Sequence, residues 1–210
     1  MPSLVGSEMC IRDSLHYCTG SRPDEELVQR GGDCDVEFED ILPGMSTAWH
    51  TSSLLAKTPL LADPPDFYYI AAEYGFGDYP YGIWLRHNGP VRFIARTMSA
   101  YRICSNDASW SSGVEGRYDK LIRFMTGAVA MHEAYRAHVT DPDVLRLVDD
   151  NILKWKFQLL YTQGKDKELR RPPYNKLLKT KPLRFRINNA VKCLFPALHR
   201  LYRRKQGYDE

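Results

Sequence analysis

The sequence has no long apolar run, no paired cysteine motif and no internal repeat. Its longest unbroken apolar stretches are only a few residues, such as residues 128–131, whereas a membrane-spanning helix needs about 20. Its five cysteines are odd in number and lack C-x-x-C spacing, which argues against a zinc ribbon or a disulfide framework. No signal-peptide pattern is readable. We therefore expect a protein without membrane spans, in the reducing cytosol.

Acidic residues are missing from one long stretch. Residues 170–205 contain twelve lysines and arginines and no aspartate or glutamate. Residues 1–112 carry 8 basic and 15 acidic side chains, whereas residues 113–210 carry 21 and 11. This shift from a net charge of −7 to one of +10 predicts two parts with different surroundings. An aromatic content of 12% argues against bulk disorder.

The first fourteen residues resemble the translation of a sequencing-adapter read-through. They read MPSLVGSEMCIRDS, and we expect them to be disordered and foreign to the natural protein. The alternative is a natural disordered N-terminus. If an adapter is fused here, the natural gene is cut at residue 14 and the chain is a fragment. The fold is therefore expected to begin at Leu15.

Two periodicities follow one another along the chain. Helical apolar spacing begins near residue 117, and Asp141-Pro142 is a typical helix start. Before it, residues 81–87 fit a helix that Asn88-Gly89 ends. Short strand patterns separated by turn signals stand at residues 15–19, 49–55, 91–94 and 98–102. The pattern predicts an α/β fold with a C-terminal helical extension.

Four short motifs follow in a fixed order between residues 49 and 112. They are Trp49-His50-Thr51-Ser52-Ser53, Gly77-Asp78-Tyr79-Pro80, Met98-Ser99-Ala100-Tyr101-Arg102 and Ser109-Trp110-Ser111. In this order they resemble the second half of the catalytic domain of family 2 glycosyltransferases, which have the GT-A fold. The resemblance covers residues 15–112 and implies a truncated GT-A-like mixed sheet on the acceptor side of the enzyme. Residues 113–210 are then a basic helical extension. The implied reaction transfers a sugar from a nucleotide-sugar donor to a glycan or lipid-linked acceptor, with inversion, as in the synthesis of cell-envelope polysaccharides.

By this resemblance, Asp78 is the catalytic base. An inverting transfer needs a group that takes the proton of the acceptor hydroxyl as it attacks the anomeric carbon. Asp78 stands between a glycine and Tyr79-Pro80 at an expected helix start, where the helix dipole favours an ionised carboxylate. The same pattern also describes an ordinary N-cap aspartate, and the two roles can coexist.

Polar residues of the other motifs are candidates for substrate contacts. His50, Thr51 and Ser52 could bind sugar hydroxyls, although a lone histidine on a strand is commonly structural. Ser109 lies in the loop that closes over the donor in the family. Arg102 could pair with a diphosphate or form a structural ion pair.

Three aromatic residues are candidates for stacking on a sugar or a base. They are Tyr79, Trp84 and Trp110, and the first and last belong to the motifs above. Aromatic rings fill cores more often than they form binding platforms. Trp110, which lies in a polar loop, fits the binding role best.

The metal-binding and nucleotide-binding half of the family has no match here. A divalent ion, Mg²⁺ or Mn²⁺, is expected for the full-length enzyme, with its ligands outside this fragment. Asp33-Cys34-Asp35 has the letters of the family's Asp-x-Asp motif but follows the wrong elements, so we treat it as a coincidence. Cys104 stands where many members have a histidine, and a thiol suits these hard ions poorly. We therefore assign no metal ligand and expect the fragment to be inactive.

The basic tail permits three interpretations. Arg184, Arg186 and Lys192 accompany an apolar stripe over residues 187–201, which we expect to kink before Pro196. A basic amphipathic helix suits an anionic membrane surface, and it also suits packing against the catalytic domain. Nucleic-acid binding finds no recognisable fold signature. The alternative to a transferase is thus a non-enzymatic helical module that binds an anionic membrane or nucleic acid. The expected location is the cytoplasm, with peripheral attachment to the cytoplasmic face of the membrane.

Overall fold

The computed structural model describes residues 9–12, 15–18, 25–27, 32–43, 54–95, 99–102 and 118–195. The chain divides into two compact units, with the boundary between Asn151 and Ile152. This boundary falls inside helix α6 (Pro142–Thr162), whereas the charge of the sequence changes near residue 112. The amino-acid composition reflects the charge of the surface, whereas the two units are defined by which residues pack together. Helix α5 (Tyr118–Arg136) packs on the first unit despite its place in the basic half of the sequence.

The first unit contains a four-stranded sheet with the order β4-β6-β1-β5. Its strands are β1 (Met9–Arg12), β4 (Cys34–Val36), β5 (Leu54–Leu55) and β6 (Val91–Ile94). β1 pairs in parallel with β6 and antiparallel with β5. Residues 9–12 of the segment that we expected to be disordered thus form a strand, and the rest of residues 1–14 lies outside the described residues. β1 covers an edge of β6 that would otherwise present unpaired backbone groups.

A second, three-stranded sheet has the order β3-β2-β7. β2 (Leu15–Cys18) pairs antiparallel with β3 (Glu25–Leu27) and in parallel with β7 (Ser99–Arg102). The strands predicted near residues 15, 91 and 98 are thus confirmed. Most of the strand predicted at residues 49–55 lies outside the described residues. Mixed sheets beside helices make the described chain an α/β structure.

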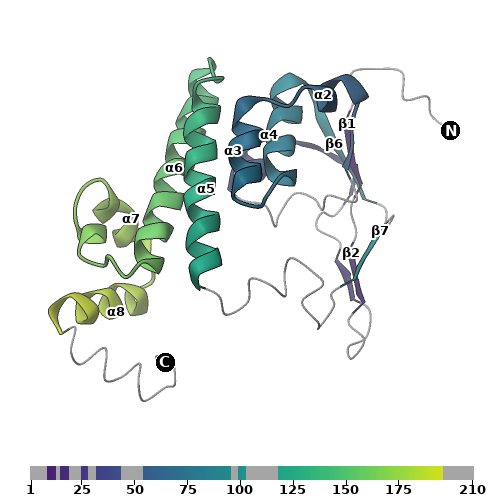
Figure 1. Cartoon of the computed structure of the whole chain (residues 1–210). Coiled ribbons are helices and arrows are strands. Elements are labelled where there is room, and N and C mark those ends of the chain that lie inside the picture. Colours follow the sequence, from purple (N-terminus) through teal and green to yellow (C-terminus); the bar gives the residue numbers. More distant parts are fainter. Residues whose placement is uncertain are drawn as a thin grey trace. The chain divides into compact units, whose positions relative to one another are not determined.

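Helices accompany the sheets of the first unit. They are α1 (Phe38–Ile41), α2 (Thr58–Ala62), α3 (Asp66–Glu73), α4 (Asp78–Asn88) and α5. Figure 1 shows α3 and α4 between the β1–β6 pair and α5, and α3 contacts both α4 and α5. Gly127 makes the close approach of α5 possible, because a Cβ there would stand 2.4 Å from Tyr74 Cβ. The largest fully buried side chains of this unit include Phe67, Tyr79, Phe93 and Tyr135.

The predicted start of α6 is confirmed in its details. Asp141 Oδ1 accepts hydrogen bonds from the backbone N–H groups of Asp143 at 2.8 Å and Val144 at 3.3 Å, and Pro142 is the first helical residue. The aspartate therefore satisfies two of the amides that a helix start leaves without backbone partners.

The second unit contains the remainder of α6 and three shorter helices. These are the 3-10 helix η2 (Glu168–Arg170), α7 (Tyr174–Thr180) and α8 (Leu183–Leu194). Phe157, Leu169 and Leu178 form its buried core. We expected a helix that kinks before Pro196, but α8 ends at Leu194, because a residue preceding proline is pushed out of the helical conformation.

Candidate functional site

Asp78 is the first residue of α4, and Gly77 is the N-cap. Asp78 Oδ1 accepts a hydrogen bond of 2.9 Å from the backbone N–H of Tyr79, one of the amides that a helix start leaves without a backbone partner. The side chain is half-buried. Gly77 is thus the N-cap, but the Asp78 side chain still accepts a backbone N–H of the first turn. It lies at the end of the helix where the dipole favours a negative charge.

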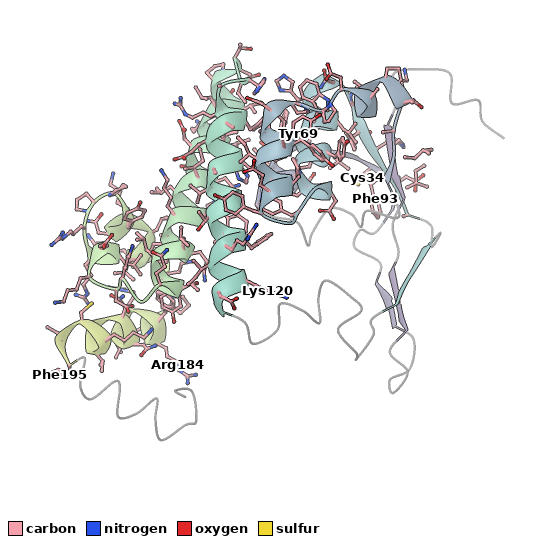
Figure 2. The ribbon with its side chains drawn as sticks, in the orientation of Figure 1. Cys34, Tyr69, Phe93, Lys120, Arg184 and Phe195 are labelled. Carbon is pink, nitrogen blue, oxygen red and sulfur yellow. The ribbon has the colours of Figure 1, made fainter. Side chains whose placement is uncertain are left out.

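Three tyrosines that the sequence analysis did not single out gather beside the start of α4. Tyr81 lies three residues after Asp78, so both side chains share one face of the helix. The ring of Tyr68 lies 4.4 Å from that of Tyr81 and 5.6 Å from that of Tyr69. Tyr68 also covers Gly77, where a Cβ would stand 3.3 Å from the Tyr68 hydroxyl. Tyr69, labelled in Figure 2, is 57% exposed. We call Tyr68, Tyr69 and Tyr81 the tyrosine cluster.

Tyr79 is a core residue, and its expected role in sugar stacking does not fit this position. Its side chain is only 2% exposed. Its hydroxyl donates a hydrogen bond of 2.8 Å to the carbonyl of Leu42 and lies 2.8 Å from His132 Nε2. Burial raises the pKa of Tyr79 well above its usual range. A buried ring whose hydroxyl is engaged inside the chain has no face for a sugar.

His132 is the centre of this buried network. Its Nδ1 lies 2.6 Å from the carbonyl oxygen of Ala128, which can only accept, so Nδ1 carries the proton. Nε2 is then an acceptor and receives a hydrogen bond of 2.8 Å from Asn151 Nδ2. Burial lowers the pKa of His132 to about 4, although the Ala128 carbonyl opposes this shift. The neutral network links α4, α5 and α6, and its role is structural.

Trp84 also makes its contacts within the chain. Its ring stacks on that of His87, with centroids 5.7 Å apart and planes 10° apart, and meets the edge of Phe67 at 6.2 Å. Burial, followed by the charge of His138, lowers the pKa of His87. Since the indole already stacks on His87 and contacts Phe67, these rings occupy surface that a sugar would need.

The other expected substrate residues are not brought together by the described part of the chain. Arg102 is the last residue of β7, where its backbone pairs in register with Cys18. The remaining candidates lie outside the described residues; they are His50, Thr51, Ser52, Ser109 and Trp110, together with Cys104.

The carboxylates of Asp33 and Asp35 make contacts within and beside the four-stranded sheet. Asp33 Oδ1 accepts the backbone N–H of Ala95 at 2.8 Å, and Asp35 Oδ1 pairs with Arg92 at 3.1 Å. These contacts agree with the interpretation of Asp33-Cys34-Asp35 as a coincidental match. Within the described ranges, no group of three or more His, Cys, Asp or Glu side chains could hold a metal ion. No ligand set for Mg²⁺ or Mn²⁺ is therefore assigned.

A hollow of about 390 Å³ lies at the C-terminal end of α4, and its lining includes Glu37, Arg86 and Asn88. An ion pair of 2.5 Å joins Arg86 to Glu37 within this lining. Because an α-helix rises about 1.5 Å per residue, Arg86 lies about 12 Å along the axis from Asp78. The hollow is therefore separate from the group formed by Asp78 and the tyrosine cluster.

Comparison with known proteins adds no relative. No family model matches the chain, and no curated protein and no solved structure shows a significant match. Among the helices of the described residues, none is both long enough and apolar enough to cross a membrane.

Proposed function

We propose that this chain carries the acceptor side of a cytoplasmic glycosyltransferase with a GT-A-like sheet, and that Asp78 is its catalytic base. The reaction transfers a sugar from a nucleotide-sugar donor to a glycan or lipid-linked acceptor, with inversion. One observation carries the proposal: a half-buried carboxylate at the start of α4 stands beside the tyrosine cluster, in which Tyr69 is exposed and Tyr68 and Tyr81 are half-buried. The motif order that resembles family 2 glycosyltransferases supports it.

The chemistry required of Asp78 is a single proton transfer. The oxygen of the acceptor hydroxyl bonds to the anomeric carbon, the bond from that carbon to the diphosphate oxygen breaks, and the hydroxyl proton passes to the carboxylate. The Tyr79 N–H holds Asp78 Oδ1 at 2.9 Å, which fixes the carboxylate before an acceptor arrives. Positioned general bases contribute about 10²–10⁴ in rate.

The tyrosine cluster supplies a platform for the acceptor. One face of a pyranose ring is apolar and packs on an aromatic ring, while tyrosine also offers a polar hydroxyl. Tyr69 is 57% exposed, and Tyr68 joins it to Tyr81, which shares the helix face of Asp78. Burial, followed by the neighbouring Tyr68, raises the pKa of Tyr81, and a hydrogen bond between the two side chains contributes to this shift. The two hydroxyl groups therefore hold each other in place beside the exposed ring of Tyr69.

A divalent ion, when bound, stabilises the charge of a departing diphosphate. The described residues do not fit such an ion, because Asp33 and Asp35 are engaged with Ala95 and Arg92. No step of the proposal is therefore routed through a metal.

Sugar transfer by protein expressed from the complete genomic reading frame that contains this sequence tests the proposal. UDP-, GDP- and dTDP-sugars are offered as donors, with oligosaccharides and lipid-linked sugars as acceptors, and the release of nucleoside diphosphate is measured. The anomeric configuration of the product is then determined by NMR. We expect inversion. Tyr69→Ala should raise the KM for the acceptor by up to about tenfold, the size of an aromatic contact, with kcat nearly unchanged. Retention of configuration, or release from none of these donors, contradicts the proposal.

A further inference from the structure

Helix α8 exposes an apolar face. Leu183, Ile187 and Leu194 are 66%, 54% and 69% exposed, and Phe195, which follows the helix, is 58% exposed. At about 100° per residue, the first three lie within about 40° of one another around the helix axis. Among the side chains whose exposure the structure describes, two further large apolar ones are exposed, and both lie in the first unit. We call Leu183, Ile187 and Leu194 the α8 stripe. Such a concentration of exposed apolar surface marks an interaction site.

The opposite face of α8 attaches the helix to its own unit. The ring of Phe185 lies 4.8 Å from that of Tyr161. Asn189 is 1% exposed and donates a hydrogen bond of 2.8 Å to Asp166 Oδ1. Lys192 Nζ lies 4.5 Å from the centre of the Tyr161 ring and 4.0 Å from Asp166 Oδ1. These inward residues lie about 140–180° from the middle of the α8 stripe, so the helix is already packed on one side and the stripe is a second, separate face.

Positive charge borders the stripe on both sides. Arg184 and Arg186 lie about 80° to either side of it, and both are exposed. No acidic residue occurs from residue 170 to residue 205. Figure 2 shows Arg184 and Phe195 near opposite ends of α8. The exposed surface of α8 is therefore apolar along its middle and cationic along its borders.

We propose that α8 lies flat on an anionic lipid surface, with the α8 stripe in the acyl boundary and Arg184 and Arg186 on the headgroup phosphates. The helix has 12 residues and is about 18 Å long, too short to cross a hydrocarbon core of about 30 Å. A nucleic acid backbone would attract the arginines but leave the stripe in water. A second copy of α8 would cover the stripe but bring like charges together. An anionic bilayer buries the apolar stripe and pairs with the arginines at its borders. The proposal does not depend on the proposed glycosyltransferase activity.

Vesicle flotation of the full chain tests this proposal. We expect binding to vesicles that contain phosphatidylglycerol, no binding to pure phosphatidylcholine, and a loss of binding at high salt because the charges are screened. Leu183→Gln/Ile187→Gln/Leu194→Gln should abolish binding while circular dichroism shows the same helix content, since all three side chains are exposed. Arg184→Gln/Arg186→Gln should weaken the partition coefficient by about fivefold per arginine.

A matched charge control separates docking from a general attraction of basic protein to anionic lipid. Lys176→Gln/Lys179→Gln removes two charges from exposed positions of α7, and it should weaken binding less than the arginine pair does. The proposal is overturned if the two pairs act equally, if the triple glutamine variant binds like the parent, or if neutral vesicles bind equally well. A dimer in sedimentation velocity that the triple variant abolishes, without vesicle binding, would assign the stripe to a second copy. Binding to double-stranded DNA but not to vesicles would assign the arginines to nucleic acid.

Discussion

Each of the two units buries an asparagine in a polar cluster, but the two clusters differ in charge. In the first unit, Asn151 donates to His132, whose depressed pKa of about 4 keeps it neutral. In the second unit, Asn189 donates to the carboxylate of Asp166 and accepts from the guanidinium of Arg170 at 3.1 Å. One core therefore depends on a group that must stay uncharged, and the other on charges that must stay paired. The stability of the two cores should therefore respond differently to low pH and to truncation of the buried asparagines.

The exposed surfaces of the units differ as well. The first unit presents a tyrosine cluster beside a carboxylate, which suits a small polar ligand with an apolar face. The second unit presents the aliphatic side chains of the α8 stripe, bordered by arginines, which suits an extended anionic surface. The composition difference between the halves of the sequence thus corresponds to two kinds of candidate partner.

Acid should produce the largest difference between the units. The pKa of His132 is about 4 in the folded chain and about 6.5 when unfolded, so the unfolded state takes the proton first. The resulting stability is fully present above pH 6.5 and is lost as the pH falls towards 4, by up to about 3 kcal/mol. His87, whose pKa is also lowered, acts in the same direction.

Urea unfolding at pH 7.5 and pH 4.5 measures this loss. His132→Gln should remove most of the pH dependence. Residues 152–195 contain no histidine, so amide exchange in the second unit should change less over the same range. An unchanged pH dependence in His132→Gln would show that other groups cause the acid sensitivity.

Alanine substitutions at two glycines, one in each unit, should lower the free energy of unfolding for different reasons. Gly127→Ala places a Cβ 2.4 Å from Tyr74 Cβ, and overpacking of this kind costs about 1–3 kcal/mol, only partly offset by the roughly 1 kcal/mol that alanine gains in a helix. Gly164 has open space around it but a φ of +71°, so Gly164→Ala should cost about 1 kcal/mol from backbone strain alone. Free energies of unfolding in urea would measure both. A Gly127→Ala variant more stable than the parent would contradict this packing of α5 against Tyr74, because alanine gains stability in a helix only where its Cβ fits.

The smallest difference is expected between the two buried asparagines. Asn189→Ala removes a hydrogen bond to a carboxylate and should cost about 1.5–3 kcal/mol, whereas Asn151→Ala removes one to a neutral imidazole and should cost about 1 kcal/mol. Thermal unfolding of both variants at neutral pH gives the comparison. Equal costs would mean that the charge of Asp166 contributes nothing to the second core.

Features that depend on neighbouring residues could be predicted from the sequence. The start of α6 is set by Asp141 and Pro142 themselves, and the strand at residues 91–94 follows directly from its own alternation. The burial of Tyr79 could not be predicted in this way, because its hydroxyl partner His132 is 53 residues away. Local sequence does not show which face of α4 meets α5. The same limit hid the tyrosine cluster, whose members come from two helices.

The tail illustrates the limit differently. Periodicity predicted an amphipathic helix near residue 187 but gave no means of choosing between packing and an external surface. The structure separates the two faces, because Phe185 and Asn189 pack inward while the α8 stripe is exposed. Composition also does not show the boundary between the compact units, because long-range packing joins α5 to the first unit.

The most direct test of the proposed function compares Asp78→Asn with Asp66→Asn in the protein from the complete reading frame. Asp66 is the first residue of α3, and its Oδ1 accepts the N–H of Phe67 at 2.7 Å, as Asp78 Oδ1 accepts that of Tyr79. Asp66 Oδ1 also lies 2.8 Å from His138 Nε2, so His138→Gln serves as the control for the loss of that contact. Both asparagine substitutions keep the shape of the side chain. If Asp78 is the base, kcat for sugar transfer falls about 10²–10⁴-fold in Asp78→Asn and stays close to the parent value in Asp66→Asn. If both variants retain kcat within about fivefold, far less than a general base contributes, Asp78 only stabilises its helix and the catalytic assignment is wrong.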